Sequence, residues 1–330
     1  MYKLLFLLFS LQLSLQINAQ SVKLLTSGTK TSIRGLSVVT DKIVWVSGSA
    51  GTIAKTSDGG KTWKWITVKG FEKTDFRDIE AFDDSVAIIM GIDSPAIILK
   101  TIDAGKTWAV VYRNDTKEMF LDAMDFVNNK EGIVIGDPMN DLFFSANTKD
   151  AGNTWQEEIA NKKIIAAKGE AAFASSGTNI RKLKNGTNIF VSGGLSSHLF
   201  IDNIAKQIPI LQGKETTGAN SIAAKNNKTF IVVGGDFNTK DSTSKNCFIT
   251  NNAGISWVAP KTSPTGYRSC IEYLYKQTWV TCGLNGVDIT TNDGQDFKQI
   301  STISFHVCKR AKKGNAVYFA GGGGRIGKLE

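Results

Sequence analysis

TSDGGKTW at residues 56–63 is the first of several copies of one eight-residue pattern. TIDAGKTW (101–108), TKDAGNTW (148–155) and TNNAGISW (250–257) repeat it, and TTNDGQDF (290–297) is a more divergent copy. In each copy an Asp or Asn stands two residues after a Thr, a Gly follows two residues later, and an aromatic residue ends the pattern. Because the pattern recurs in register, it indicates a repeat architecture.

The repeated pattern has the chemistry of a tight turn between two strands, which we call the Asp-box. The Asp or Asn oxygen accepts hydrogen bonds from the loop, the Gly adopts a positive φ, and the aromatic residue anchors the next strand. The acceptor residues are Asp58, Asp103, Asp150, Asn252 and Asn292. Each is committed to its own turn, so we interpret them as structural rather than as calcium ligands or catalytic groups.

The spacing of the Asp-boxes predicts the number of repeats. Their aromatic residue recurs at positions 63, 108, 155, 257 and 297, and the one double-length gap indicates a hidden repeat. Residues 170–175, 189–194 and 199–201 have the strand order of that repeat without its Asp-box. The chain contains 32 Gly but only 5 Pro, with short apolar runs between turn residues, which is typical of short strands.

The units add up to a closed ring. Inner strands are predicted to begin near Ile33, Phe76, Phe120, Ala171, Ala219, Tyr267 and Phe305. Their spacing of about 40 to 50 residues suits four-stranded blades. The last unit ends after a third strand at 325–329, and residues 22–26 offer a spare strand. We therefore predict an all-β, seven-bladed β-propeller of antiparallel four-stranded blades, closed by the N-terminal strand in the last blade.

The start of the chain has the pattern of a signal peptide, residues 1–19. Lys3 precedes an apolar stretch from Leu4 to Leu15, and Asn18-Ala19-Gln20 offers a small-residue cleavage site. Ser and Gln interrupt the stretch before it reaches the roughly 20 residues that span a membrane. We therefore expect an exported chain, periplasmic or secreted, whose mature part (20–330) is one propeller domain with no integral membrane segment.

The charge of the chain argues against a nucleic-acid partner. The net charge of +9 comes mainly from Lys residues scattered over turns and strand edges. Scattered charge of this kind is typical of a solvated surface that discourages edge-to-edge aggregation. No basic run interleaved with aromatic residues is present, so we expect no nucleic acid as a partner.

The Asp-boxes, together with openings such as Phe76-Arg77-Asp78-Ile79, resemble the photosystem II stability and assembly factor-like propellers, relatives of the bacterial neuraminidase repeat proteins. The resemblance covers nearly all of the mature chain. It implies a non-catalytic scaffold that binds protein partners in a lumen or periplasm, with arginines near the central channel. Arg34, Arg77 and Arg268 match that arginine position, whereas the other blades carry Leu121, Ala172, Asn220 and His306 there.

Function is expected at the channel mouth where the inner strands begin, because the Asp-boxes lie at the opposite rim and binding residues concentrate on loops. The predicted ligand-binding set is Arg34, Arg77, Arg268, His306 and Arg325, with Asp93, Asp137, Asp141 and Asp236 from loops between second and third strands. Guanidinium groups suit an anionic ligand because they donate two hydrogen bonds at once. The alternative is that these charges pair with each other and line a wet channel.

Four cysteines leave two interpretations open. Cys270 and Cys282 are expected opposite each other on adjacent strands, close enough for a disulfide in an exported protein. Alternatively they are buried free thiols, since Cys308 falls at the same blade position as Cys270. We predict no metal site, because only two His residues exist and no Cys-x-x-Cys pair does.

Two functions are compatible with the pattern. The first is a monomeric scaffold without a cofactor that binds a protein partner or an anionic glycan or other ligand at the mouth. The second is a glycoside hydrolase of sialidase-like or glucanase-like type, because such enzymes share Asp-box propellers. The Arg-Ile-Pro openings of sialidases are absent, and Glu80 and Glu272, the nearest acids, fall inside inner strands.

Overall fold

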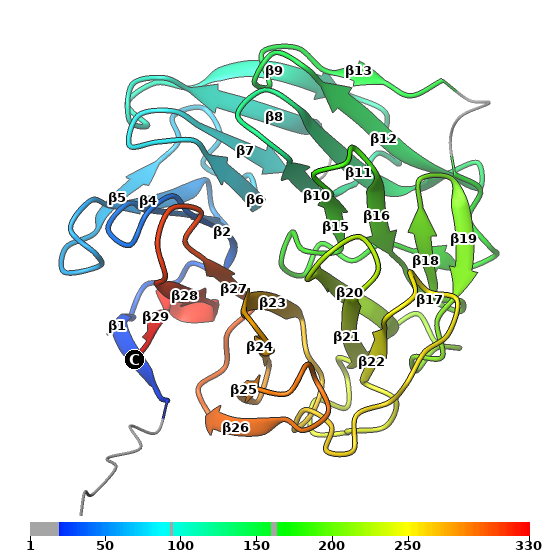
Figure 1. Cartoon of the computed structure of the whole chain (residues 1–330). Helices are drawn as coiled ribbons and strands as arrows, with labels where there is room; N and C mark the ends of the chain where they lie inside the picture. The colour runs from blue at the N-terminus through cyan, green and yellow to red at the C-terminus, as the bar shows by residue number, and fades with distance from the viewer. Residues whose placement is uncertain (1–19, 93–94, 160–163) are drawn as a thin grey trace, which may run out of the picture.

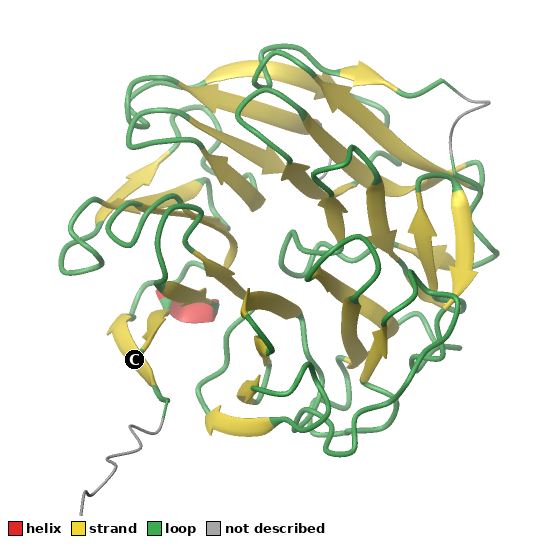
Figure 2. Cartoon of the chain, viewed as in Figure 1, coloured by secondary structure: helices red, strands yellow, loops and turns green. Residues whose placement is uncertain are grey.

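The structure, a computed structural model, describes residues 20–92, 95–159 and 164–330, so the predicted signal peptide lies outside the described residues. Seven antiparallel sheets surround a central channel (Figure 1), and almost all regular structure is strand, as Figure 2 shows. This confirms the predicted seven-bladed β-propeller. No helix formed by the described residues is long and apolar enough to cross a membrane.

The strands follow the chain around the ring. Blades 1 to 3 contain β2 (Ile33–Val38), β3 (Val44–Gly48), β4 (Thr52–Thr56), β5 (Lys64–Thr67), β6 (Phe76–Ala81), β7 (Ala87–Gly91), β8 (Ala96–Thr101), β9 (Ala109–Asn114), β10 (Leu121–Phe126), β11 (Gly132–Met139), β12 (Leu142–Thr148) and β13 (Gln156–Glu157). Blades 4 and 5 contain β14 (Glu170–Ala171), β15 (Ile180–Lys182), β16 (Asn188–Val191), β17 (Gly193–Gly194), β18 (His198–Ile201), β19 (Ile204–Gln207), β20 (Thr217–Ala224), β21 (Phe230–Asp236) and β22 (Cys247–Thr250). Blades 6 and 7 contain β23 (Cys270–Tyr275), β24 (Thr278–Gly283), β25 (Gly286–Thr290), β26 (Lys298–Ser301), β27 (Val307–Arg310), β28 (Val317–Ala320) and β29 (Ile326–Leu329), with a 3-10 turn at Gly322–Gly324.

The ring is closed by the two ends of the chain. Strand β1 (Val22–Thr26) pairs antiparallel with β29, with Val22 opposite Leu329 and Leu24 opposite Gly327. It becomes the outer strand of blade 7, as predicted, and lies beside β29 in Figure 1. The closure covers an edge of β29 that would otherwise expose unpaired backbone groups.

The core lies between neighbouring blades. Trp45 on β3 of blade 1 is fully buried and packs in one cluster with Ile79 and Ile89 of blade 2. Its indole N–H donates a hydrogen bond to the Asp83 carbonyl oxygen at 3.1 Å. Trp108, the aromatic residue of the second Asp-box, packs against the same cluster. The Asp-box aromatics therefore join blades, which explains why they recur.

The Asp-box turns form the expected hydrogen bonds. Asp103 Oδ1 accepts from the Thr107 N–H at 2.9 Å and from the Thr101 hydroxyl at 2.8 Å, and Oδ2 accepts from the Thr107 hydroxyl at 2.6 Å. Asp58 and Asp150 repeat this arrangement, and Asn252 and Asn292 accept the equivalent N–H at their Oδ1. The hydrogen bonds from Thr107 lower the pKa of Asp103 to about 2. Each acceptor is occupied within its own turn.

Blade 4 departs from the prediction. Its inner strand is β15, which begins at Ile180 and not near Ala171, while β14 pairs with β17 in the sheet that continues into β20 of blade 5. The prediction was wrong because the apolar run 171–174 resembles an inner strand. Residues 173–179, which we call the plug, instead enter the channel and contact four other blades.

The contacts of the plug show that it crosses the centre of the propeller. Ser175 accepts a hydrogen bond from Arg34 of blade 1, and Ser176 donates to the Ser269 carbonyl oxygen of blade 6 at 2.7 Å. Thr178 shares a hydrogen bond of 2.7 Å with Ser221 of blade 5. Gly177 lies against the Asp78 carboxyl group of blade 2. The plug therefore closes the channel and forms the floor of the space at its mouth.

Candidate functional site at the channel mouth

One side chain from each of six blades points into the mouth of the channel. In blades 1, 2, 3 and 5 the inner strand has a register shift, so that one residue on it has no partner on the second strand. Such bulges re-aim a side chain out of the sheet. In blades 6 and 7 the backbone N–H of the equivalent residue instead donates a hydrogen bond to the second strand, to the carbonyl oxygen of Cys282 and of Ala320, respectively. The six residues, which we call the mouth ring, are Arg34, Arg77, Asp122, Asn220, Ser269 and His306.

The mouth ring surrounds a pocket with a cavity volume of about 430 Å³. Residues Ala171–Ser175, which lead into and begin the plug, form one wall of it, and Phe120, Phe237, Tyr267 and Leu284 add apolar surface. The pocket thus combines two guanidinium groups and a few polar groups with aromatic surface, which is typical of ligand sites that fix orientation by polar contacts.

The two arginines of the pocket differ in their partners. Arg77 pairs with Asp75 at 2.8 Å, between Nε and Oδ2. Arg34 donates from Nη1 to the Ser175 carbonyl oxygen at 3.1 Å, and it forms no ion pair with a carboxylate of the described residues. Burial lowers the pKa of Arg34, and the positive charge of Arg77 lowers it further. A bound anion would relieve both effects.

Two carboxyl groups share the pocket with these arginines. Burial raises the pKa of Asp122 well above its usual range, and the neighbouring Asp137 raises it further, whereas Arg77 and the N–H of Ala174 act in the opposite direction. Neither Asp122 oxygen makes a hydrogen bond of ordinary geometry. Burial raises the pKa of Asp137 to about 6, although its Oδ1 accepts the Ala172 N–H at 3.0 Å. Burial therefore favours the neutral form of Asp122 beside the charged guanidinium groups, whereas Asp137 changes its charge near pH 6.

His306 is neutral at pH 7. Burial and the charges of Arg34, Arg325 and Arg77 lower its pKa to about 4, although its hydrogen bond to the Ile33 carbonyl oxygen, 3.0 Å from Nδ1, acts in the opposite direction. The imidazole contributes shape and a hydrogen-bonding group, but no charge, in the physiological range.

Arg268 does not face the pocket, contrary to the prediction. Its side chain is 0% exposed and pairs with Asp288 on β25, with 2.6 Å between Nε and Oδ2. The cause is an offset of one residue in the alignment of blade 6 with blade 1. Gly283 packs against the Cα of Arg268 just as Gly48 packs against the Cα of Ile33. Arg268 therefore aligns with Ile33, and Ser269 aligns with Arg34. A one-residue shift moves a side chain to the other face of a strand.

The same one-residue offset in blade 3 brings Asp122, which the sequence pattern does not indicate, into the mouth ring. Gly136 packs against the Cα of Leu121, so Leu121 aligns with Ile33 and Asp122 is the mouth-ring residue of blade 3. The glycine that ends each second strand gives the correct alignment of the blades in sequence. The aromatic residue that opens each unit does not, because Phe120 and Tyr267 stand one position earlier than Phe76 does in its blade.

The remaining predicted residues lie in different places. Arg325 is next to the pocket, where it acts electrostatically on His306 and donates from Nη2 to the Ser304 hydroxyl at 2.8 Å. Asp236 is buried and accepts the Asn238 N–H of its own turn at 2.9 Å. Asp141 is exposed in the turn between β11 and β12. Asp93 lies outside the described residues. Of the predicted set, Arg34, Arg77, His306 and Asp137 line the pocket together.

The cysteines have the predicted register but form no disulfide. Cys270 lies directly opposite Cys282 on the paired strands β23 and β24. All four cysteines are free and buried, so of the two interpretations that the sequence left open, the buried free thiols describe the structure. Cys308 of blade 7 lies 3.6 Å from Cys270, between the sulfur atoms.

The acids considered for hydrolysis are engaged elsewhere. Glu80 pairs with Lys312, and Glu272 pairs with Arg181 at 3.6 Å and accepts the Arg310 N–H. Neither lines the mouth pocket. Of the described acidic residues, Asp122 and Asp137 line it, on adjacent strands of one blade.

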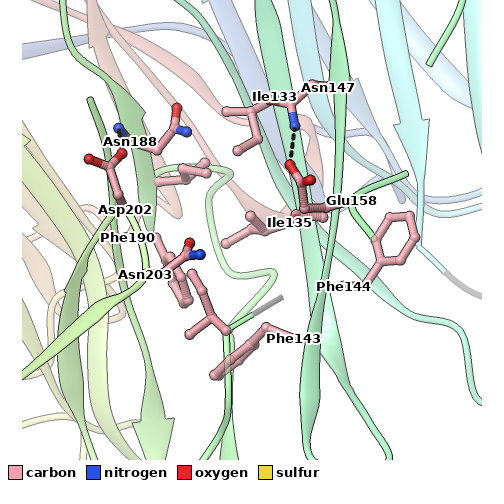
Figure 3. A pocket seen from close by; sticks show the side chains of 13 residues that line it. Ile133, Ile135, Phe143, Phe144, Asn147, Glu158, Asn188, Phe190, Asp202 and Asn203 are labelled. Carbon is pink, nitrogen blue, oxygen red and sulfur yellow. Dashed lines mark hydrogen bonds between the residues drawn. The ribbon is translucent and has the colours of Figure 1, made fainter. Parts of the chain in front are cut away.

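A smaller cavity, of about 120 Å³, lies between blades 3 and 4 (Figure 3). Ile133, Ile135, Phe143 and Phe190 form its apolar lining. The polar groups at its rim bond to near neighbours: Glu158 accepts from the Asn147 side chain, and Asp202 accepts the Asn188 N–H. These carboxylates are therefore less available to a ligand than the arginines at the mouth.

Fold and site together define a seven-bladed Asp-box propeller with a basic and aromatic pocket at one mouth of a plugged channel. The family described as "Photosynthesis system II assembly factor YCF48" matches residues 15–116. This stretch of the chain is thus similar to the photosystem II assembly factor family, in agreement with the resemblance seen in the sequence. No curated protein sequence matches the chain.

Solved structures with the same fold cover nearly the whole chain. "YCF48 bound to D1 peptide" has a TM-score of 0.64 at 15% identity, covering 95% of this chain and 97% of that chain. YCF48 from Cyanidioschyzon merolae has a TM-score of 0.67 at 14% identity, covering 94% and 99%. The Pan2 WD40 domain of Neurospora crassa reaches 0.63 at 10% identity, covering 95% and 96%. At these identities the likeness concerns the fold.

Proposed function

We propose that this chain is an exported, non-catalytic scaffold that binds an anionic segment of a protein partner in the mouth pocket. The observation that carries the proposal is Arg34, a partly buried guanidinium group in an open pocket whose protein contact is one carbonyl oxygen and which has no ion-pair partner in the described chain. A carboxylate is the natural partner for such a group, because a guanidinium group binds it through two parallel hydrogen bonds.

The surroundings of Arg34 suggest the kind of segment. Phe120, Phe173 and Phe237 line the same pocket, so an apolar or aromatic side chain next to the carboxylate would gain contact area. A peptide is a ligand of this type, and a protein of the same fold has been solved with a peptide bound. Export is proposed from the signal-peptide pattern of residues 1–19.

Capture of the partner from an envelope extract tests this proposal. Arg34→Ala and Arg77→Ala are expected to weaken capture of one specific protein about tenfold or more each, since each removes a charge-assisted contact. Arg113→Ala is the matched control, because Arg113 is exposed on β9 and pairs with its neighbour Asp115. The proposal fails if capture is unchanged in both pocket variants, or if Arg113→Ala weakens it equally.

The pH dependence of binding follows from Asp137. Its carboxyl group has a pKa of about 6 in the folded protein, so it is neutral below this pH and repels an anion above it. Affinity for the captured anionic segment is therefore expected to fall as pH rises through 6, by up to about tenfold. Asp137→Asn should flatten this profile, because an Asn oxygen can still accept the Ala172 N–H. Titrations on both sides of pH 6 measure the effect; an unchanged slope in Asp137→Asn would contradict it.

Asp122 and Asp137 are also the one observation that favours the second candidate, a glycoside hydrolase. Paired carboxyl groups with different raised pKa values can act as acid and base in glycoside hydrolysis. A screen of sialosides and plant glucans, with Asp122→Asn as the control, decides between the two candidates. Turnover that disappears in this variant would establish hydrolysis, and its absence in the wild type would leave the scaffold.

A further inference from the structure

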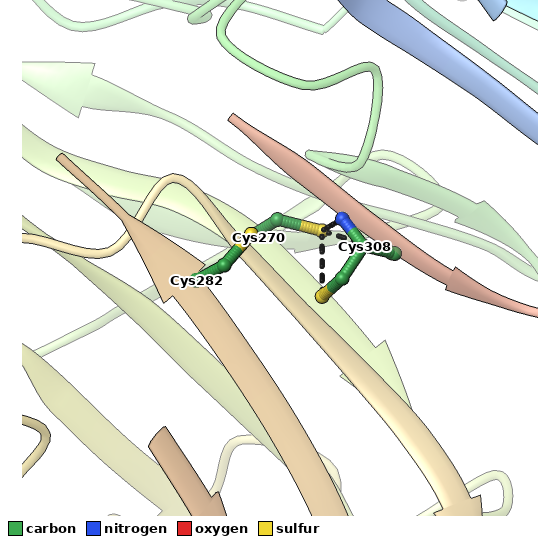
Figure 4. A group of neighbouring side chains, drawn as sticks. All are labelled: Cys270, Cys282 and Cys308. Atoms are coloured by element: carbon green, nitrogen blue, oxygen red, sulfur yellow. Dashed lines mark hydrogen bonds between the residues drawn. The ribbon is translucent and has the colours of Figure 1, made fainter. Parts of the chain in front are cut away.

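Three cysteines from two blades meet in the core. Cys270 begins β23 and Cys282 lies on β24 of blade 6, while Cys308 lies on β27 of blade 7 (Figure 4). Their sulfur atoms all lie within 4.8 Å of one another. Among groups of three or more His, Cys, Asp and Glu residues in the described part of the chain, this is the one whose ligand atoms converge closely enough to hold a metal ion.

The environment of Cys270 suits a thiolate, whereas burial raises the pKa of Cys282 and of Cys308 well above the usual range. Cys270 Sγ accepts hydrogen bonds from the Cys308 N–H at 3.3 Å, from the Thr178 hydroxyl at 3.5 Å and from Cys308 Sγ at 3.6 Å. The guanidinium groups of Arg181 and Arg268 lie close enough to act electrostatically on Cys270 and Cys282. Donors and positive charge around sulfur offset part of the cost of burying negative charge.

The spacing of the sulfurs fits metal coordination. Ligands at about 2.3 Å from one metal lie about 3.8 to 4.0 Å apart in tetrahedral or trigonal geometry, and the Cys270–Cys308 separation of 3.6 Å is near that value. The ligand set is three sulfurs, and the two His residues lie elsewhere, His198 against Glu170 and His306 at the mouth. Soft thiolate ligands select Cu⁺, zinc and iron–sulfur clusters, but structural zinc and iron–sulfur clusters are almost always held by four ligands, so a set of three sulfurs favours Cu⁺.

We propose that Cys270, Cys282 and Cys308 form a three-sulfur site for a soft monovalent metal ion, Cu⁺. The cysteines give up protons as the metal binds, because thiolates are the ligands. The site lies beneath Thr178 of the plug, so the ion enters during folding or when the plug opens. The proposal concerns the core and does not depend on what binds at the mouth.

Transfer of Cu⁺ from its bicinchoninate complex to the reduced mature chain, without oxygen, tests the proposal. We expect one Cu⁺ per chain, three sulfur neighbours in X-ray absorption, and a higher melting temperature. Cys270→Ser, Cys282→Ser and Cys308→Ser should each weaken binding by more than about 100-fold, because even neighbours of ligands change metal affinity 10- to 100-fold. Cys247→Ser is the matched control, since Cys247 is an equally buried thiol in blade 5, outside the cluster.

Refolding with and without Cu⁺ covers the case in which a serine variant does not fold. The wild-type chain is refolded with or without Cu⁺ and then treated with an alkylating reagent in urea. In the sample refolded with Cu⁺, Cys270, Cys282 and Cys308 should be protected from alkylation, while Cys247 reacts. The proposal is overturned if no Cu⁺ is transferred after refolding, if Cys247→Ser weakens binding as much as the others, or if Zn²⁺ is bound in preference to Cu⁺. A disulfide between two of the three cysteines in the purified protein would also overturn it.

Discussion

Arg268→Ala is expected to lower the free energy of unfolding by about 3–5 kcal/mol, because it leaves the Asp288 carboxylate buried without its charged partner. Both side chains are 0% exposed, and Arg268 also donates from Nη1 to Asn285 Oδ1 at 2.5 Å and to the Tyr267 carbonyl oxygen at 2.8 Å. The loss therefore breaks a buried network rather than one bond. Urea unfolding followed by circular dichroism measures the effect.

Two comparisons separate this structural role from ligand binding. Arg77→Ala should change stability by less than about 1 kcal/mol, since its pair with Asp75 is partly exposed, while it weakens capture of the partner. The double variant Arg268→Met, Asp288→Leu should recover much of the lost stability, because apolar groups of similar volume replace a buried pair at little cost. Arg268→Ala that keeps full stability but loses partner capture would show that Arg268 binds ligand after all.

Gly177→Ala is expected to destabilise the protein by about 2–4 kcal/mol. Gly177 has a φ of +62°, and a Cβ there would overlap the buried Asp78 carboxyl group. Left-handed backbone costs other residues about 1–2 kcal/mol, and overpacking a core adds about 1–3 kcal/mol. Asp78 cannot move aside freely, because its oxygens accept the N–H groups of Ile79 and Met124 at 2.8 and 2.7 Å. Thermal and urea unfolding both measure the change.

Gly186→Ala is the control for the plug. Gly186 also has a positive φ, +91°, but no atom lies within 4 Å of a Cβ built there. Its substitution should cost only the backbone strain of about 1 kcal/mol. Equal losses of stability for the two variants would mean that the plug does not press on Asp78. A larger loss of stability for Gly177→Ala would show that the plug is packed in the channel against Asp78.

The regular part of the fold was predictable because each blade repeats the same local chemistry. The Asp-box hydrogen bonds are made within eight residues, and the apolar strand that ends in Gly recurs in register. The closure by residues 22–26 followed from counting strands, and β1 pairs with β29 as expected. Only blade 4, where the turn motif is missing, was assigned the wrong inner strand.

The site was predictable only in part, because it depends on register. Of the residues predicted for the mouth, Arg34, Arg77, His306 and Asp137 line one pocket in the structure. In blades 3 and 6 the predicted ring positions, Leu121 and Arg268, lie one residue before the observed ones, Asp122 and Ser269, and a shift of one residue moves a side chain to the other face of its strand. Sequence periodicity alone does not locate a bulge, and the bulge is what turns the ring residue toward the channel.

By itself, the sequence determined the seven-bladed propeller, its closure and the end of the channel to which the charges belong, since these follow from local turns and a repeated strand pattern. Only the tertiary structure decided that residues 173–179 plug the channel, that Arg268 serves a buried ion pair, and that three cysteines meet between blades 6 and 7. These features join residues far apart in the chain. Their side chains meet through the packing of one blade on another, and no local pattern records that contact.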